Sequence, residues 1–321
     1  MLNYTQLCNN IYIVKEDSTR TNILNSLLLE EEKETCTILI DTNYPFRAID
    51  ELYSRLKYPV KALFLSHFHT DHTAHAFYHE QKFKTPIYCP VQEGTLLKSI
   101  NNIMDSIGFS KLGLKDTYLM FAIKNMKFQE CKQVNTYTPG DKIFNCSKID
   151  IETIHIPGHS PGHTAFIIES NKNIETRKIL YASDIGALPY YGDLNSNLKE
   201  YRESINKLEK IYLSDDFILI PSHGNIYIEK DDDFFNRIRG RIKKIETKIL
   251  NSLSKTKPKS IKELVDERIL TPEKEIYPPI KDLYYLWDGG MILQHLNEFI
   301  EKKIVEKIEE KDLLNDKYIL V

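Results

Sequence analysis

The chain has 321 residues, of which 41% are hydrophobic and 28% charged, and its formal net charge is −3 at pH 7. This length predicts one large domain and a smaller one, and the charge balance argues against a generally basic nucleic-acid-binding protein. No run approaches the roughly 18 apolar residues of a membrane span, and the amino terminus lacks a secretory signal pattern. The five scattered cysteines favour free thiols, so we expect a cytoplasmic protein without membrane contact.

The amino-terminal part alternates apolar runs with polar turns, which predicts a sheet with one early helix. The expected strands are 11–14, 23–29, 37–40 and 60–65, and the expected helix is 45–57. Asp41 directly follows the third strand. An aspartate at a strand end is typical of a simple turn.

A dense group of metal-binding residue types follows the strand 60–65. His67, His69, Asp71 and His72 lie within the six positions 67–72. Imidazole and carboxylate ligands at this density are what a borderline ion such as Zn²⁺ prefers. Without an ion, four such groups in one loop would be a cluster of buried polar atoms that lack partners. The loop therefore predicts a metal site.

The sequence His-Phe-His-Thr-Asp-His over 67–72 resembles the H-x-H-x-D-H signature of the metallo-β-lactamase superfamily, and the resemblance runs from Asn9 to Ile228. It implies an α+β fold, an αββα sandwich of two mixed sheets flanked by helices. It also implies that His67 and His69 bind a first metal ion, while Asp71 and His72 bind a second. Asp41 would then be a supporting residue rather than a ligand.

The segment after this loop carries two further histidines and a long insertion. We expect a helix over 73–83 with His75 and His79 at i and i+4, on one face. A separate metal pair there is disfavoured, because the preceding loop already supplies a full set. Residues 92–133 form a helical insertion that either covers the active site or only extends the core, and both interpretations stay open.

A second histidine loop follows the expected strand 149–156. The sequence Pro-Gly-His-Ser-Pro-Gly-His-Thr over 157–164 resembles the third motif of the superfamily. In this resemblance His163 completes the first metal site and His159 supports the loop. The loop also contains a G-x-S-x-G pattern around Ser160, but a serine hydrolase needs the N–H of the next residue for its oxyanion hole. That residue is Pro161, which has no N–H, so a serine hydrolase is excluded.

Two more strands end in candidate ligands. Asp184 ends the strand 179–184 and resembles the carboxylate that bridges both metals, and His223 follows the strand 218–222 in the last ligand position. The implied ligand set is His67, His69, Asp71, His72, His163, Asp184 and His223. Tyr190 and Tyr191 could reach the substrate or simply pack. Our catalytic candidates are Asp71, Asp184 and Tyr191.

The character of the chain changes near residue 236, which suggests domains over 1–235 and 236–321. A basic amphipathic helix begins near Arg237. The expected elements after it are helices over 260–269 and 282–302 and strands over 304–308 and 318–321. This order resembles a winged helix, as in the superfamily branch that includes beta-lactamase-like protein 2, an endoribonuclease. The acidic helix 282–302 is a poor surface for phosphates, so we expect this module to pack against the catalytic domain or a second subunit.

The resemblance implies hydrolysis at two divalent metal ions, with Zn²⁺ as the first candidate and iron or manganese as alternatives. A hydroxide held between the ions would be the nucleophile, because coordination lowers the pKa of water to about 7. We expect a glyoxalase II-like hydrolase of a small-molecule thioester, ester or lactone. A metal-dependent endoribonuclease is the enzyme alternative, and an iron-dependent redox protein or sulfur dioxygenase is the alternative of another class. RNA and a second copy of the chain are the alternative partners.

Overall fold

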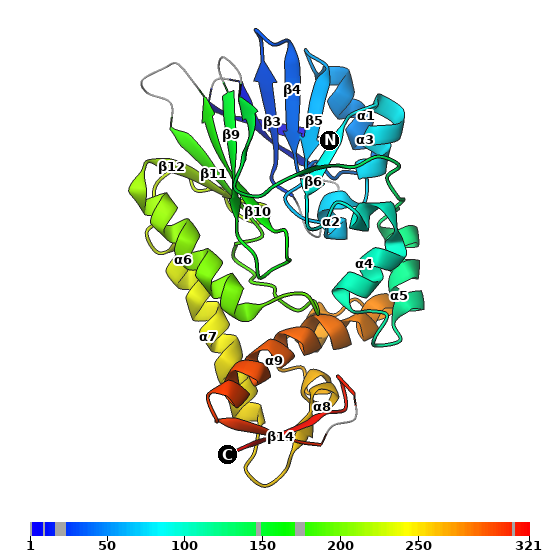
Figure 1. The fold of residues 1–321 in the computed structure, drawn as a ribbon, viewed down its shortest axis with the longest axis vertical. Coiled ribbons are helices and arrows are strands. Elements are labelled where there is room, and N and C mark those ends of the chain that lie inside the picture. The colour runs from blue at the N-terminus through cyan, green and yellow to red at the C-terminus, as the bar shows by residue number, and fades with distance from the viewer. Residues whose placement is uncertain (1, 9, 17–23, 146–148, 171–176, 310–311) are drawn as a thin grey trace.

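The structure is a computed structural model that describes residues 2–8, 10–16, 24–145, 149–170, 177–309 and 312–321. A seven-stranded sheet and a five-stranded sheet stack in its centre, with helices outside both (Figure 1). A third sheet of three strands lies in the carboxy-terminal part. Both large sheets contain parallel and antiparallel pairs, so the expected α+β sandwich of mixed sheets is confirmed.

The first sheet has the strand order β1-β2-β3-β4-β5-β6-β7. Its strands are β1 (Leu2–Cys8), β2 (Ile11–Glu16), β3 (Ser26–Glu31), β4 (Cys36–Ile40), β5 (Val60–Phe64), β6 (Ile87–Pro90) and β7 (Asn135–Tyr137). Neighbours from β1 to β4 are antiparallel, and neighbours from β4 to β7 are parallel. The strand expected over 23–29 is found as β3, and residue 23 lies outside the described residues.

The second sheet has the order β12-β11-β10-β9-β8. Its strands are β8 (Lys142–Asn145), β9 (Ile149–His155), β10 (Thr164–Ser170), β11 (Lys178–Ser183) and β12 (Phe217–Pro221). The pair β11–β12 is parallel and the other described pairs are antiparallel. The expected strands 149–156, 179–184 and 218–222 correspond to β9, β11 and β12.

The alternation of side chains along the strands divides the core into layers. In β3, Leu27 and Leu29 face the second sheet, whereas Leu28 between them faces the helices. Successive residues of a strand point to opposite faces, so one strand contributes to two apolar layers. Because both faces of these central strands are covered, their sequences are nearly continuous apolar runs rather than alternating patterns.

Helices cover the outer face of each large sheet. Those on the first sheet are α1 (Phe46–Arg55), α2 (Thr70–Thr73) and α3 (Ala76–Phe83), and those on the second are α6 (Leu198–Ser214) and α7 (Phe234–Ser252). The single helix expected over 73–83 is instead two helices, because the backbone at His75 is not helical (φ −107°, ψ 9°). Helix α6 is not among the elements predicted from the sequence. Its first turn is capped by Asn197, whose side chain accepts a hydrogen bond from the N–H of Glu200.

The insertion 92–133 contains η1 (Leu96–Lys98), α4 (Ile100–Ile107), α5 (Lys115–Met120) and η2 (Phe121–Asn125). Its buried residues, among them Ile103 and Met104, join the apolar layer outside the first sheet. The hydroxyl of Tyr118 also donates to Oγ1 of Thr70, 3.3 Å away, in the helix that carries Asp71. The insertion therefore extends the core and also contacts the first histidine loop.

The carboxy-terminal part has its own apolar cluster, which includes Leu264, Leu296 and Tyr318. After α7 come β13 (Lys259–Ser260), α8 (Ile261–Asp266), η3 (Glu273–Glu275), η4 (Pro278–Leu283), α9 (Tyr284–Glu301), β14 (Val305–Glu309) and β15 (Lys317–Leu320), with the sheet order β13-β15-β14. Helix α7 joins the apolar layer outside the second sheet through Phe235, whose ring lies beside that of Tyr212 in α6, and it joins this cluster through Ile249, so it spans both parts. Among the described residues, no helix combines the length and apolar character needed to cross a membrane.

Candidate metal centre

The histidine and aspartate loops meet at one edge of the sandwich, beyond the carboxyl ends of the parallel strands. The chain leaves β5 at Phe64 and reaches His67 three residues later. Asp184 directly follows β11, and His223 follows β12. Because parallel strands end at the same edge, these loops converge there, where open α/β sheets commonly bind ligands.

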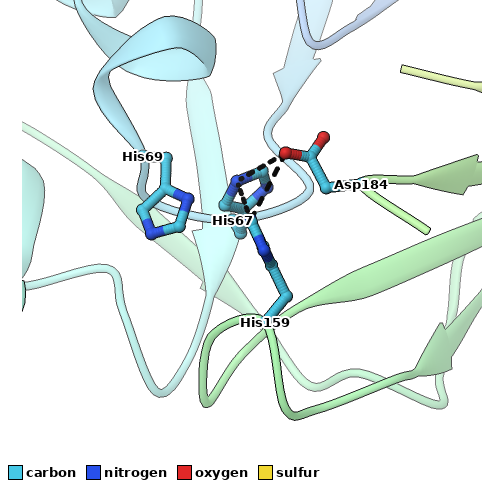
Figure 2. Close-up of side chains that lie close together, drawn as sticks. All are labelled: His67, His69, His159 and Asp184. Atoms are coloured by element: carbon cyan, nitrogen blue, oxygen red, sulfur yellow. Dashed lines mark hydrogen bonds and ion pairs between the residues drawn. The ribbon is translucent and has the colours of Figure 1, made fainter. Parts of the chain in front are cut away.

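The first group of side chains consists of His67, His69, His159 and Asp184, which come from three separate loops. Each offers one ligand atom, and these atoms lie within 4.8 Å of one another. Figure 2 shows the rings of His67 and His159 and the carboxylate of Asp184 turned toward a common point. Nε2 of His159 lies 3.1 Å from Nε2 of His67 and 3.3 Å from Oδ2 of Asp184.

The second group consists of Asp71, His72, Asp184 and His223, again within 4.8 Å. Oδ1 of Asp184 lies 3.0 Å from Nε2 of His72 and 3.8 Å from Nε2 of His223. Oδ2 of Asp71 lies 3.4 Å from the same nitrogen of His223. The two carboxylate oxygens of Asp184 thus face different groups, which is the arrangement of a carboxylate that bridges two cations.

The structure exchanges the roles expected for the two histidines of the loop 157–164. His159 lies in the first group, whereas His163 is turned toward the backbone. Nδ1 of His163 donates to the carbonyl of Ile156 at 3.1 Å, and its Nε2 accepts from the N–H of Asp184 at 3.2 Å. Both ring nitrogens of His163 are thereby engaged, so the structure places His159, and not the expected His163, in the first group.

Tyr191 does not face either of the two groups of candidate ligands, contrary to its selection as a catalytic candidate. Its side chain is fully buried, and its hydroxyl shares a hydrogen bond 2.8 Å long with Nε2 of His295 in α9. Tyr190 lies closer to the two groups, with its ring centroid 5.6 Å from that of His159. Tyr191 therefore packs, and Tyr190 is the tyrosine beside the candidate ligands.

Asp41 supports the first histidine loop, as one of its two interpretations anticipates. Its carboxylate accepts hydrogen bonds from the N–H of Ser66 at 2.7 Å and from the hydroxyl of Tyr181 at 3.0 Å. Its Oδ2 also lies 3.0 Å from Nδ1 of His72. Asp41 has φ +47°, a left-handed conformation that non-glycine residues adopt rarely. These contacts hold it in that conformation and fix the ring of His72.

Neither His75 nor His79 belongs to the two groups. Nδ1 of His79 hydrogen-bonds the hydroxyl of Tyr53 at 3.0 Å, inside the layer outside the first sheet. Burial lowers the pKa of His79 to about 3, so the ring is neutral at ordinary pH. The i, i+4 spacing of these histidines is a packing feature.

Asp193 was not identified from the sequence, yet it contacts a candidate ligand. Its Oδ2 accepts a hydrogen bond from Nε2 of His69 at 2.6 Å, across 124 positions of the chain. A histidine that donates one ring N–H to a carboxylate presents its other nitrogen to a metal in a fixed direction. No local pattern around Asp193 signals this contact, because the partner lies in another loop.

The electrostatics of the site suit divalent cations. Burial lowers the pKa of His67 well below its usual value and favours the neutral imidazole that binds metals. Burial also lowers the pKa of His72, but the carboxylates of Asp184 and Asp41 outweigh it and raise this pKa well above its usual value. These buried carboxylates thus require nearby positive charge. The donor set, histidine nitrogens and carboxylate oxygens in two groups, fits divalent ions such as zinc.

The two groups differ in their exposure. The side chain of His67 is fully buried, whereas those of Asp71 and His223 are 26% and 27% exposed. Solvent, and a substrate, can therefore approach the second group more easily than the first.

Comparisons with known proteins agree with this geometry. Residues 20–223 match the metallo-beta-lactamase superfamily. The chain is 26% identical over 224 residues to the hydroxyacylglutathione hydrolase GloC of Haemophilus influenzae, an alignment that covers 67% of this chain and 91% of that protein.

Two solved structures resemble nearly the whole chain. A beta-lactamase domain protein from Burkholderia ambifaria has a TM-score of 0.71 at 15% identity, covering 99% of this chain and 94% of its own. A metallo-beta-lactamase family protein from Thermus thermophilus has a TM-score of 0.71 at 16% identity, covering 98% and 100%. This likeness concerns the fold, and it includes the carboxy-terminal part.

Proposed function

Because the chain belongs to the metallo-beta-lactamase superfamily and is a metallo-hydrolase, we propose that its two groups of histidines and aspartates bind two divalent metal ions, with zinc as the first candidate. The single observation that carries this proposal is the shared position of Asp184, whose two oxygens face different groups. The proposed ligands are His67, His69, His159 and Asp184 for the first ion and Asp71, His72, Asp184 and His223 for the second.

We propose a small-molecule thioester or ester as the substrate, with a lactone as a related option. The similarity to a hydroxyacylglutathione hydrolase over most of that protein's length supports a thioester. The partly exposed side chains of Asp71 and His223 give a small substrate access to the site. Two divalent ions, when bound, activate water as a nucleophile and polarise the carbonyl that it attacks.

The chain's own residues would orient this chemistry. Asp71 is the exposed carboxylate of the second group and is held 3.4 Å from His223, so it can accept a hydrogen bond from the attacking water. Asp184 fixes the spacing of the two groups through its two oxygens. His72 is held between Asp184 and Asp41, with each of its ring nitrogens 3.0 Å from a carboxylate oxygen.

The order α7, β13, α8, α9, β14, β15, with the sheet order β13-β15-β14, supports the proposal that the carboxy-terminal part is a winged helix. In a DNA-binding helix-turn-helix, the second helix of the pair enters the major groove. Here that helix is α9, and Gly290, Met291 and His295 on it are buried. We therefore propose that this module serves the catalytic part rather than DNA.

An activity panel tests the proposed function. The purified protein, prepared without chelator, is analysed for zinc, iron and manganese and assayed on a glutathione thioester, a simple ester, a lactone and single-stranded RNA. We expect nearly two equivalents of metal and thioester or ester turnover, which Asp184→Asn abolishes and Asp232→Asn, an exposed aspartate, leaves unchanged.

Other outcomes of the panel would overturn the proposal in different ways. RNA cleavage that depends on Asp184, without thioester turnover, would favour the endoribonuclease alternative. A coloured protein with bound iron and no hydrolytic activity would favour a redox protein or dioxygenase. Hydrolytic activity in a protein without bound metal would overturn the proposal of a metal site.

A further inference from the structure

Helix α9 of the carboxy-terminal part meets the loop after β11 backbone to backbone. A Cβ added to Gly290 would overlap the carbonyl oxygen of Gly192 and lie 2.6 Å from its carbonyl carbon. A Cβ added to Gly192 would in turn overlap the carbonyl oxygen of Trp287, one turn earlier in α9. Only glycine permits such an approach, so both facing positions are tied to this one contact.

Polar contacts on either side of the two glycines hold the same loop. The hydroxyl of Tyr191 shares its hydrogen bond of 2.8 Å with His295, five residues after Gly290 in α9. Nε2 of Gln294 donates to the carbonyl of Ser196 at 2.9 Å, and Oε1 of Gln294 accepts from the N–H of Leu198 at 3.4 Å. The loop is thus attached to α9 at several points between residues 191 and 198.

The face of this loop opposite α9 touches two proposed ligands of the first metal ion. Oδ2 of Asp193, which is 2% exposed, accepts from Nε2 of His69 at 2.6 Å. The carbonyl of Tyr190 accepts from Nδ1 of His159 at 2.8 Å. The hydroxyl of Ser196 donates to the carbonyl of His159 at 2.8 Å. Each contact engages the ring nitrogen or backbone atom that is not offered to the metal.

These contacts form a continuous connection from the carboxy-terminal part to the first metal site. We propose that α9 is a positioning element: it sets the loop 190–196, and through Asp193 and Tyr190 this loop orients His69 and His159. The helix that would read DNA in a winged helix would thus support a catalytic site here. Figure 1 shows α9 running beneath the sandwich. This inference rests on the proposed function, because it takes His69 and His159 as ligands.

The residues that belong to the second group alone are held by other segments. His72 is fixed by Asp41, and the loop of His223 is fixed by Asn25, whose amide donates to the carbonyls of Pro221 at 2.7 Å and Gly224 at 3.2 Å. Displacement of the loop 190–196 should therefore weaken the binding of one metal ion and leave the affinity for the other unchanged. A general loss of stability would not produce this selectivity.

The test compares Gly290→Ala with Gly240→Ala, a matched control in which the new Cβ meets nothing within 4 Å. Zn²⁺ affinities are measured by chelator competition, and the visible spectrum is recorded after Co²⁺ substitution. We expect Gly290→Ala to bind one of two ions roughly 10- to 100-fold more weakly, as is typical when the partner of a ligand is displaced. We expect an altered Co²⁺ spectrum for that site only, and no change in Gly240→Ala.

Two milder variants keep the inference testable if Gly290→Ala does not fold. Tyr191→Phe removes only the hydroxyl that reaches α9, and Asp193→Asn keeps the shape of the side chain that holds His69. Circular dichroism with chelator present shows whether each variant is folded. We expect both variants to lower the affinity for the same one of the two ions, with the larger effect in Asp193→Asn.

The outcomes separate this inference from the proposed function. If the wild-type protein binds no metal, the proposed function fails and the inference fails with it. If the wild type binds two ions and the folded α9 and loop variants bind both equally tightly, only the inference is overturned. An equal loss of affinity for both ions would also contradict the inference, because α9 would then act on the whole fold rather than on the first site.

Discussion

Two histidines four residues apart, His159 and His163, illustrate how ligand identity is decided. Both lie in one short loop and are fully buried or nearly so. Both ring nitrogens of His163 hydrogen-bond to backbone groups. In His159 only Nδ1 hydrogen-bonds to a backbone carbonyl. A metal ligand needs an available nitrogen lone pair, so the surroundings of each ring, rather than its position in the motif, determine which histidine can serve as a ligand.

The first prediction follows from this difference. His159→Ala should reduce the bound metal from nearly two equivalents to nearly one, because it removes a proposed ligand. His163→Ala should lower stability by breaking two hydrogen bonds inside the loop, but the folded protein should still bind two equivalents. Elemental analysis after dialysis measures both. Loss of one equivalent in His163→Ala, with two retained in His159→Ala, would restore the assignment from sequence.

The second prediction concerns pH and the buried ring of His79. Burial lowers its pKa from 6.5 to about 3, so between these values the unfolded chain binds a proton that the folded chain excludes. Its contribution to stability is therefore complete above pH 6.5 and is lost as the pH falls toward 3. The loss approaches about 1.4 kcal/mol per pH unit.

Urea unfolding of the chelator-treated protein from pH 7 to pH 4 measures this effect. The free energy of unfolding of His79→Gln should depend on pH less steeply than that of the wild type, whatever its absolute stability. Equal slopes for the two proteins would show that His79 is protonated in the folded state.

Short helices in this chain depend on their ends. Helix α8 has six residues, Ile261–Asp266, too few to be stable by propensity alone. It begins with a capping box: Oγ of Ser260 accepts from the N–H of Glu263 at 3.1 Å, and Oε2 of Glu263 accepts from the N–H of Ser260 at 2.7 Å. Each bond satisfies a donor that the helix geometry leaves free.

The third prediction is that Ser260→Ala lowers the free energy of unfolding by about 1 kcal/mol, the usual cost of losing such a cap. Ser214→Ala is the control, because this exposed hydroxyl only donates to a carbonyl of its own helix. Denaturant unfolding followed by the fluorescence of the single tryptophan, Trp287 in α9, measures the free energy of unfolding. A cost no larger than that of the control would mean that packing alone defines the start of α8.

Acidic side chains neutralise part of the positive charge on the basic face of α7. Arg237 pairs with Asp231, and Arg239 pairs with Glu209. Lys243 pairs with Glu246 at 2.9 Å. A shallow hollow of about 430 Å³ runs along this face and is lined by Arg237, Gly240, Arg241, Lys243, Lys244 and Thr247. The acidic partners weaken the case for a phosphate-binding surface, although exposed cations remain.

The fourth prediction therefore uses two exposed cations of this face, Arg241 and Lys244. The double variant Arg241→Glu with Lys244→Glu should leave thioester or ester turnover unchanged, because a small substrate does not need this surface. RNA binding by the wild type should be weak and should fall steeply with salt, as counterion release requires. Assays at two salt concentrations measure both. RNA cleavage that the double variant loses would make this face part of a nuclease.

Much of the architecture could be predicted from local patterns. Apolar runs separated by turns marked β3, β4, β5, β11 and β12, because strands buried on both faces have this composition, whereas β9 alternates apolar and polar residues. The density of histidine and aspartate over 67–72 marked the candidate metal loop, and the structure places the aspartate after β11 and the histidine after β12 beside it. Each of these signals is contained in a few consecutive residues, so no knowledge of distant partners is needed to recognise it.

The remaining features depend on contacts between segments far apart in the chain. The bond of Asp193 to His69 spans 124 positions, and that of Tyr191 to His295 spans 104. Sequence spacing could not distinguish His159 from His163 or Tyr190 from Tyr191, because neighbours in a loop share the same local pattern. The strand patterns and the ligand types follow from the sequence alone. Which nitrogen or hydroxyl faces the site was decided by the tertiary structure, because backbone groups and side chains of other loops occupy the competing atoms.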